Sequence, residues 1–184
     1  MIFTPQELSA LGIKAGRHVR VSRGVQFFTK DVEIGDFSRI DHGTILTGRI
    51  RIGRYVHIAP YCVFYGKAGI EIGDYSGFGA FTAFHSESDD YSGRSMIGPC
   101  VPDEYRPYKT MGKITVGRNV LGGTRVTILP GVSLKDGVSI GAHSLVKSDL
   151  EPDTMYAGVP AKRIREKSKE VWHLTRNLEL GIEP

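Results

Sequence analysis

The 184-residue chain has little cysteine and no long apolar run. Its two cysteines, Cys62 and Cys100, are too few for a disulfide scaffold or a four-cysteine zinc site, so we expect reduced thiols in a cytoplasmic protein. No segment approaches the roughly 18 apolar residues that cross a bilayer. The N-terminal residues lack a charged stretch followed by an apolar core, so we expect no signal peptide.

Charge of one sign is also scarce. Twenty-four basic residues stand against 20 acidic ones, a formal net charge of +4, which alone is too weak to indicate a nucleic-acid binder. Hydrophobic residues make up 40% and charged residues 24% of the chain, which favours one folded domain and argues against wholesale disorder. Glycine, by contrast, is abundant. The 23 glycines amount to about 12.5% against a usual figure of about 7%, and their even spread indicates many turns.

An apolar side chain recurs every six residues. The series runs without a miss through Ile34, Ile40, Leu46, Ile52, Ile58, Phe64 and Ile70. It resumes at Ile72, Phe78 and Phe84, and again at Val116, Gly122, Ile128, Leu134, Ile140 and Val146. A period of six fits neither an α-helix nor a hairpin sheet, but is typical of a β-helix built from hexapeptides. Three repeats would close a triangular coil, and residues 18 positions apart would stack about 4.8 Å apart. We therefore predict an all-β fold with the apolar residue pointing inward.

Two segments interrupt the repeat. Residues 85–113 carry no hexapeptide and are rich in polar and turn residues, and a long excursion from a regular scaffold is more often functional than ornamental. From residue 161 the apolar residues lie near helical spacing, which predicts an amphipathic helix over about 162–180 that ends at Gly181. We thus divide the chain into a β-helix domain, 1–160, which includes the loop 85–113, and a C-terminal helix segment, 161–184. At the N-terminus, Thr4 and Pro5 predict a capped helical turn.

The hexapeptides, a polar loop that begins at a histidine, and the run A-G-V-P-A-K at 157–162 occur in one order along the chain. Over about residues 13–165 the chain resembles the left-handed β-helix acyltransferases, which include galactoside, maltose and serine acetyltransferases and the sugar acetyltransferases of surface-polysaccharide (lipopolysaccharide O-antigen) biosynthesis. The resemblance implies a left-handed parallel β-helix, a homotrimer with active sites between subunits, and acetyl-CoA or another short acyl-CoA as co-substrate. The loop H-S-E-S-D-D-Y-S-G is most similar to enzymes acting on nucleotide-linked 4-amino-4,6-dideoxy sugars.

The polar loop supplies the candidate catalytic residues. Acyl transfer needs a proton acceptor, and imidazole titrates near neutral pH. The resemblance implies that the base begins this loop, which makes His85 the leading base; the alternative is a histidine that only positions substrate. In galactoside-type relatives the histidine lies four residues later relative to the repeat. Asp89 and Asp90 are candidates to orient His85 or to bind the sugar amine, unless they are merely solvated acids. Ser86 and Glu87 are candidates for hydrogen bonds to the substrate.

Two further histidines, His42 and His57, lie on coils and are candidates to line the substrate cleft. Neither an H-x-H nor an H-E-x-x-H spacing occurs in the chain. We therefore predict no catalytic metal.

The resemblance also implies a donor site on the late coils. Relatives bind the pantetheine arm there through backbone amides of small residues, and the matching positions are Gly122, Gly123 and Ala142. His143 stands where relatives usually carry a glycine, close to the expected donor channel, and is a candidate to touch the donor. Leu121 stands where relatives carry a tryptophan. Lys162 and Arg163 match basic residues that meet the nucleotide phosphates, to which cations form charge-assisted hydrogen bonds; the alternative is a solvated basic start of a helix.

Three functions stay open at this point. The chain is an N-acyltransferase of a nucleotide-activated amino sugar, a sugar O-acetyltransferase, or a non-enzymatic trimer, either a scaffold or a carbonic-anhydrase-like protein. An amine with a pKa near 8 is partly neutral at about pH 7 and needs little help from a base, whereas a hydroxyl requires one. The polar loop and the A-G-V-P-A-K motif favour an enzyme, and the likeness of the loop favours the N-acyltransferase.

Overall fold

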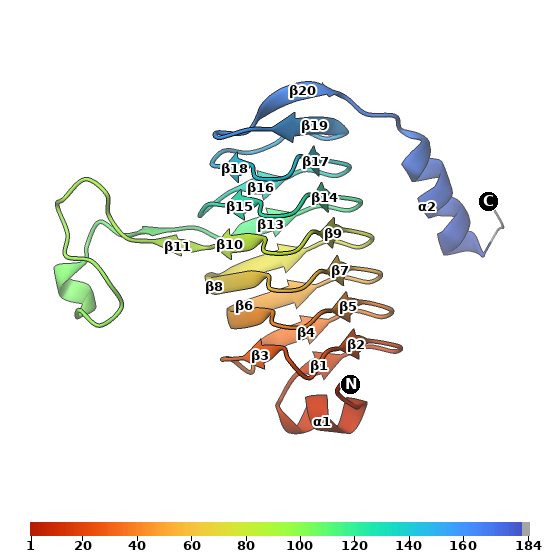
Figure 1. Ribbon diagram of the computed structural model, residues 1–184, viewed down its shortest axis with the longest axis horizontal. Coiled ribbons are helices and arrows are strands. Elements are labelled where there is room, and N and C mark those ends of the chain that lie inside the picture. The colour runs from red at the N-terminus through yellow and green to blue at the C-terminus, as the bar shows by residue number, and fades with distance from the viewer. Residues whose placement is uncertain (182–184) are drawn as a thin grey trace.

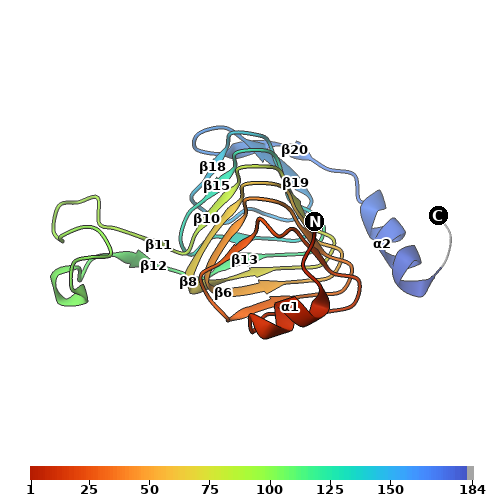
Figure 2. The ribbon, with the colours of Figure 1, turned by 60° about the horizontal axis from the view of Figure 1, so that its bottom comes forward.

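The computed structural model describes residues 1–181; residues 182–184, the end of the predicted segment 161–184, lie outside the described residues. The chain winds into a column of stacked coils that starts above helix α1 (Pro5–Ala10) and ends at strands β19 and β20. A long arm leaves one side of the column, and helix α2 (Glu170–Leu180) lies on the opposite side (Figures 1 and 2).

Short parallel strands form the walls of the column. One sheet within residues 1–181 contains β1 (Lys14–Ala15), β3 (Gln26–Phe27), β4 (Val32–Ile34), β6 (Ile45–Ile52), β8 (Val63–Ile72), β10 (Ala83–His85), β13 (Ile114–Val116), β15 (Thr127–Ile128), β16 (Ser133–Leu134) and β18 (Leu145–Val146). A second sheet contains β2 (Arg20–Val21), β5 (Arg39–Ile40), β7 (His57–Ile58), β9 (Gly77–Phe78), β14 (Leu121–Gly122), β17 (Ser139–Ile140), β19 (Thr154–Ala157) and β20 (Lys162–Glu166). The arm carries β11 (Glu87–Ser88), β12 (Thr110–Met111) and a 3-10 turn, Asp103–Tyr105.

The strand register confirms the predicted coil. Val32 pairs with Ile50, and Thr127 pairs with Leu145, in both cases 18 positions further on. Ala83, however, pairs with Thr127, 44 positions on. The arm is therefore an insertion of 26 residues into one coil. The strands before and after the arm, β10 and β15, pair with each other, so the wall of the column continues across the insertion.

The apolar residue of each repeat points inward, as predicted. All seven residues of the first series are at most 5% exposed. Phe64 and Phe84 stack in the core with their ring centroids 4.5 Å apart. Gly122 occupies an inward position because Phe78, one coil below, fills the space: a Cβ on Gly122 would lie 2.4 Å from a ring carbon of Phe78.

Both ends of the column are closed by local structure. The predicted N-terminal turn is confirmed: Thr4 Oγ1 accepts a hydrogen bond from the Glu7 N–H (3.2 Å), and Glu7 Oε2 accepts one from the Thr4 N–H (2.8 Å). Such a reciprocal capping box satisfies two free N–H groups of the helix.

The C-terminal segment differs from the prediction at its start. Residues 162–166 form strand β20, which runs antiparallel to β19, and the helix begins only at Glu170. The last coil has a free strand edge, and β20 pairs with that edge. The hydrogen bonds of this pairing outweigh the local preference for a helix that the apolar spacing indicates. Gly181 ends α2 in the left-handed conformation, as predicted. Trp172 Nε1 donates to Asp153 Oδ1 (2.8 Å) and anchors the helix to the column.

Candidate active site

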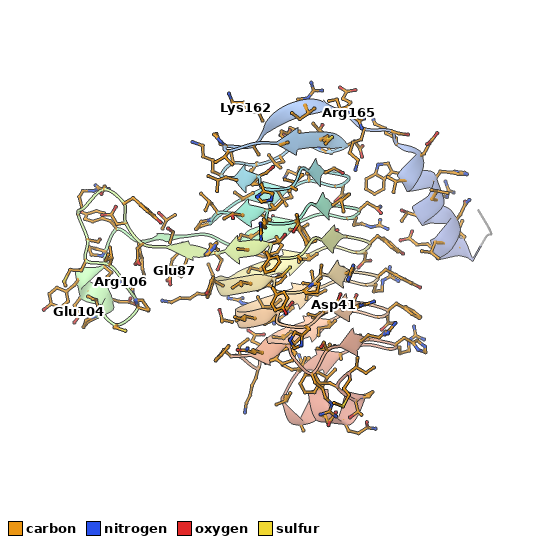
Figure 3. All side chains as sticks on the ribbon, in the orientation of Figure 1. Asp41, Glu87, Glu104, Arg106, Lys162 and Arg165 are labelled. Atoms are coloured by element: carbon orange, nitrogen blue, oxygen red, sulfur yellow. The ribbon has the colours of Figure 1, made fainter. Side chains whose placement is uncertain are left out.

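The arm begins directly after His85, the last residue of β10. β11 and β12 pair antiparallel at its root, where Glu87 lies, and Arg106 lies in its outer part (Figure 3). Asp90 organises the first turn of the arm: its carboxylate accepts hydrogen bonds from Ser92, Arg94 and Ser95. The bonds from the Ser92 side chain and backbone are the main reason that the pKa of Asp90 is lowered. Asp90 is thus fully engaged in holding the loop.

Asp89 links the beginning of the arm to its outer half. Its Oδ2 accepts a hydrogen bond from the Gly98 N–H (3.0 Å), and its Oδ1 accepts one from Arg106 Nη2 (3.2 Å). The Arg106 side chain is only 4% exposed. Within residues 1–181 neither Asp89 nor Asp90 hydrogen-bonds to His85. The two acids therefore shape the loop that surrounds the histidine, and the geometry gives no support to their orienting its ring.

A cavity of about 510 Å³ lies between the arm and the column. Its wall includes Tyr65, His85, Glu87, Ser88, Arg106 and Thr127. A neighbouring cavity of about 630 Å³ extends from Ser88 and Tyr91 to Leu145 and Lys147 on the later coils. The two share Ser88, Asp89, Tyr91 and Leu129. Together they form a hollow long enough to join the loop to the C-terminal coils.

His85 is the half-buried imidazole of this cavity. Its ring lies against that of Tyr65 from the coil below, with centroids 5.2 Å apart. Burial lowers the pKa of His85 below its usual value of 6.5, because a charged ring loses more by leaving water than a neutral one. The lowered pKa favours the uncharged ring at neutral pH, and an uncharged imidazole has one nitrogen that can accept a proton.

The residues next to His85 divide between the cavity and the column. Glu87 lines the cavity, and its Oε2 lies 2.9 Å from Lys67 Nζ. Ser86 is fully buried: its Oγ donates to the Tyr65 carbonyl (2.8 Å) and accepts from the Ala68 N–H (2.9 Å). Ser86 thus joins two coils and is turned away from the cavity, so its predicted contact with substrate has no support in the geometry.

The sequence reasoning missed Tyr65, Ser88, Thr127 and Arg106. Tyr65 and Thr127 could have been found, because Tyr65 follows the inward Phe64 as His85 follows Phe84, and Thr127 precedes the inward Ile128. Arg106 lies in a loop without periodicity, and no local pattern marks it as buried.

The two coil histidines lie elsewhere. His57 is on β7, in the second sheet, whereas His85 is on β10 in the first. His57 Nε2 lies 2.8 Å from Asp41 Oδ2. His42 is exposed, and its ring lies nearly perpendicular to that of Tyr61, with centroids 5.9 Å apart. A single protomer therefore does not bring either histidine to the cavity of His85.

Comparison with known proteins shows which family shares this architecture. No family model matches the chain. The chain is 36% identical over 173 residues to a dTDP-4-amino-4,6-dideoxy-D-glucose acyltransferase of Escherichia coli, a match that covers 91% of this chain and 90% of the relative. It belongs to the hexapeptide-repeat acyltransferase family. A putative lipopolysaccharide biosynthesis O-acetyl transferase of E. coli K12, WbbJ, is 32% identical over 80% of this chain and 64% of that protein.

A solved structure of this acyltransferase family superposes over nearly the whole chain. AntD, an N-acyltransferase from Bacillus cereus, is 30% identical with a TM-score of 0.95, and the match covers 98% of this chain and 99% of that one. It was solved in complex with dTDP and coenzyme A. The resemblance seen in the repeats and the polar loop is therefore confirmed, as is the β-helix with its C-terminal helix.

The predicted donor residues of this acyltransferase lie on the late coils. Gly123 donates its N–H to the Ile140 carbonyl (2.8 Å), so that N–H already belongs to the wall of the column. Ala142 and His143 are exposed at a turn, where His143 has a φ of 59°. Lys162 and Arg163 are exposed on β20. Figure 3 shows Lys162 at the C-terminal end of the column. Arg163 Nη2 lies 3.0 Å from Glu166 Oε1.

Two further observations concern residues 1–181. No helix in this range is long and apolar enough to cross a membrane. The same residues hold no group of three or more histidine, cysteine, aspartate or glutamate side chains placed to hold a metal ion.

Proposed function

We propose that this protein transfers an acetyl or other short acyl group from acyl-CoA to the amino group of a nucleotide-linked amino-deoxy sugar in surface-polysaccharide biosynthesis. The observation that carries the proposal is the whole-chain match to AntD, since one form of AntD, 31% identical to this chain, was solved with dTDP-4-amino-4,6-dideoxyglucose and coenzyme A. The name of the E. coli relative specifies the same kind of acceptor.

In the proposed reaction the neutral amine forms a bond to the acyl carbon, and the bond from that carbon to the coenzyme A sulfur breaks. His85 takes up the proton that the amine loses and returns it to the leaving thiolate, which balances the step. The half-buried, uncharged imidazole suits this role. The alternative, in which His85 only positions the sugar, predicts the same products but a smaller effect of substitution.

The donor is proposed to lie along the late coils, beside Gly122, Gly123, Ala142 and His143, with its phosphates at Lys162 and Arg163. The hollow reaches Leu145 and Lys147, which directly follow the turn of Ala142 and His143, and this supports the placement at that turn. The exposed guanidinium of Arg163 suits phosphate because it forms two parallel hydrogen bonds.

The protein is further proposed to be a cytoplasmic homotrimer with active sites between subunits, in which 1–160 is the catalytic β-helix domain and 161–184 the C-terminal segment. Tyr61 and Phe81 support a subunit contact at one corner of the column. They stack with centroids 5.2 Å apart and are 48% and 49% exposed. Both have left-handed backbones, with φ of 61° and 63°, a conformation that costs a non-glycine residue roughly 1–2 kcal/mol. The corner of Phe37 and Tyr55 has the same features, but α2 bonds to it through Tyr75, which leaves the corner of Tyr61 and Phe81 as the candidate for a subunit contact.

A thiol-release assay tests the proposed function. Acetyl-CoA is offered with dTDP-4-amino-4,6-dideoxyglucose and, in parallel, with dTDP-glucose, which has only hydroxyl acceptors. We expect release with the amino sugar and little with the hydroxy sugar; the opposite preference would favour an O-acetyltransferase like WbbJ, and silence with both would exclude the proposal. A protein blank is required because Cys100 is exposed, whereas burial raises the pKa of Cys62 to about 11.

A further inference from the structure

Four outward positions of the second sheet form a strip along the column. Arg20 pairs with Arg39, Arg39 with His57, and His57 with Gly77. Paired residues of neighbouring strands lie about 4.8 Å apart on the same face. The strip therefore presents two guanidinium groups, an imidazole and a position without a side chain in one row. All three side chains are exposed.

Asp41 fixes the middle of the strip. Its Oδ1 accepts a hydrogen bond from Arg39 Nε (2.6 Å), and its Oδ2 lies 2.8 Å from His57 Nε2. The Asp41 side chain is only 15% exposed, and this burial raises its pKa, but the bonds from His57 and Arg39 outweigh burial and lower it overall. The ionised carboxylate makes His57 Nε2 a donor, and it leaves both Nη groups of Arg39 for another partner.

Gly77 leaves a gap in the row of outward side chains, between His57 and Leu121. A Cβ built on Gly77 would meet only the His57 carbonyl oxygen, at 3.8 Å. Its φ is not in the left-handed region, so the backbone does not require glycine there. Leu121, the next residue up the sheet, is 58% exposed and borders the gap from above. The strip thus has a cationic end and a partly apolar recess.

We infer that this strip binds the diphosphate of the nucleotide sugar at Arg20 and Arg39, with the sugar ring in the recess at Gly77. Guanidinium groups form strong paired hydrogen bonds to phosphate oxygens. The inference rests on the proposed function. Coenzyme A also carries a diphosphate, but Lys162, which is proposed to meet it, lies at the far C-terminal end of the column, away from Asp41 (Figure 3).

The position of the strip has a consequence for the assembly. The strip lies on the second sheet, while His85 and its cavity belong to the first. Because the two sheets face different directions, we expect one nucleotide sugar to reach both where the strip of one protomer faces the His85 cavity of a neighbour. Each active site is then completed by two subunits, one that binds the nucleotide and one that holds the base.

Titration calorimetry with dTDP tests the inference. We expect Arg20→Gln and Arg39→Gln each to weaken dTDP binding about tenfold, as loss of a charge-assisted hydrogen bond does, and coenzyme A binding to stay within about twofold. Arg17→Gln is the matched control, because Arg17 carries the same charge, is 80% exposed and pairs with Asp36 at an adjacent turn; it should bind dTDP as the unaltered protein does. Gly77→Val, which fills the recess, should keep dTDP affinity and raise the KM for the amino sugar nucleotide.

The outcomes separate the inference from the proposed function. If the double variant Arg20→Gln/Arg39→Gln binds dTDP as tightly as an active unaltered protein, the strip is wrong and the function stands. If the double variant loses coenzyme A binding instead, the strip serves the donor and the inference is wrong. An unaltered protein that neither binds dTDP nor transfers an acyl group would overturn both.

Discussion

The rings of Tyr65 and His85 lie one coil apart, with their centroids 5.2 Å from each other and their planes tilted by 31°. Tyr65 shields the imidazole from water, which helps to hold the pKa of His85 below its usual value of 6.5. We predict that Tyr65→Ala raises this pKa, because the charged ring regains solvent. An NMR titration of the histidine ring protons, with His85→Asn to assign the resonance, measures it. A titration midpoint that is unchanged or lower in Tyr65→Ala would show that Tyr65 does not control the pKa of His85.

Substitution of His85 tests its role as a base through the acceptor type and the pH dependence of the rate. As a base for a hydroxyl acceptor, His85 should be worth at least about a hundredfold in rate, whereas an amine acceptor, already partly neutral, should suffer much less from His85→Ala. We therefore expect a modest loss in kcat with the amino sugar nucleotide, and a smaller loss at higher pH where the amine is neutral. His173→Ala, an exposed histidine on α2, is the control and should leave kcat unchanged. An unchanged rate in His85→Ala on every acceptor would remove His85 from the mechanism.

Phe78 and Gly122 share one volume inside the column. Gly122→Ala alone should destabilise the protein by about 1–3 kcal/mol, because the added methyl group overpacks the core. In the double variant Phe78→Leu/Gly122→Ala the smaller side chain makes room, so the combined loss should be less than the sum of the two single losses. Urea unfolding at one fixed protomer concentration measures all four corners of the cycle. Strict additivity would mean that the two residues do not compete for space.

Phe81 tests the subunit contact. If the corner that carries Tyr61 and Phe81 is buried between subunits, Phe81→Glu places a charge in an apolar contact and should convert the trimer to a monomer in light scattering. Phe37→Glu is the matched control, since Phe37 is also exposed, stacked on a tyrosine and in the left-handed region, but at the corner that α2 contacts through Tyr75. A trimer that survives Phe81→Glu, or that Phe37→Glu disrupts equally, would place the contact elsewhere.

Mixed trimers test whether one site uses two subunits. His85→Ala and the double variant Arg20→Gln/Arg39→Gln are each expected to be impaired. Co-expression in equal amounts would leave about a quarter of the sites with both an intact strip and an intact His85, if these come from neighbouring subunits. We therefore expect activity above the mean of the two parents at low concentrations of the sugar nucleotide. If strip and His85 act within one protomer, no mixed site is intact and the activity equals that mean.

The repeat made the column predictable, whereas its exceptions were not. The apolar step of six assigns Phe64 and Phe84 to the core, because each coil repeats the same local geometry. The arm has no such repeat: the burial of Arg106 depends on Asp89, 17 residues earlier in the chain. Strand β20 likewise depends on a free edge that exists only after the column has formed.

The candidate site was predictable to a similar extent. The loop beginning at His85 is where the cavity lies, but the sequence could not show that Asp90 would be used up in turns or that Ser86 would face the column. Asp41 and His57 meet because Arg39 lies directly below His57 in the register. The coil length of 18 residues predicts that Arg39 and His57 are neighbours. The contact between Asp41 and His57 could have been predicted from it once the turn after β5 was known.

Analysis of the sugar product tests the central claim most directly. The protein is incubated with acetyl-CoA and dTDP-4-amino-4,6-dideoxyglucose, and the nucleotide sugar is then recovered for mass spectrometry before and after mild alkali. The account predicts a gain of one acetyl group per molecule that survives alkali, as an amide does, with one free thiol released for each acetyl transferred. An acetyl group that alkali removes would reveal an ester and an O-acetyltransferase, and an unmodified sugar beside intact acetyl-CoA would contradict the account altogether.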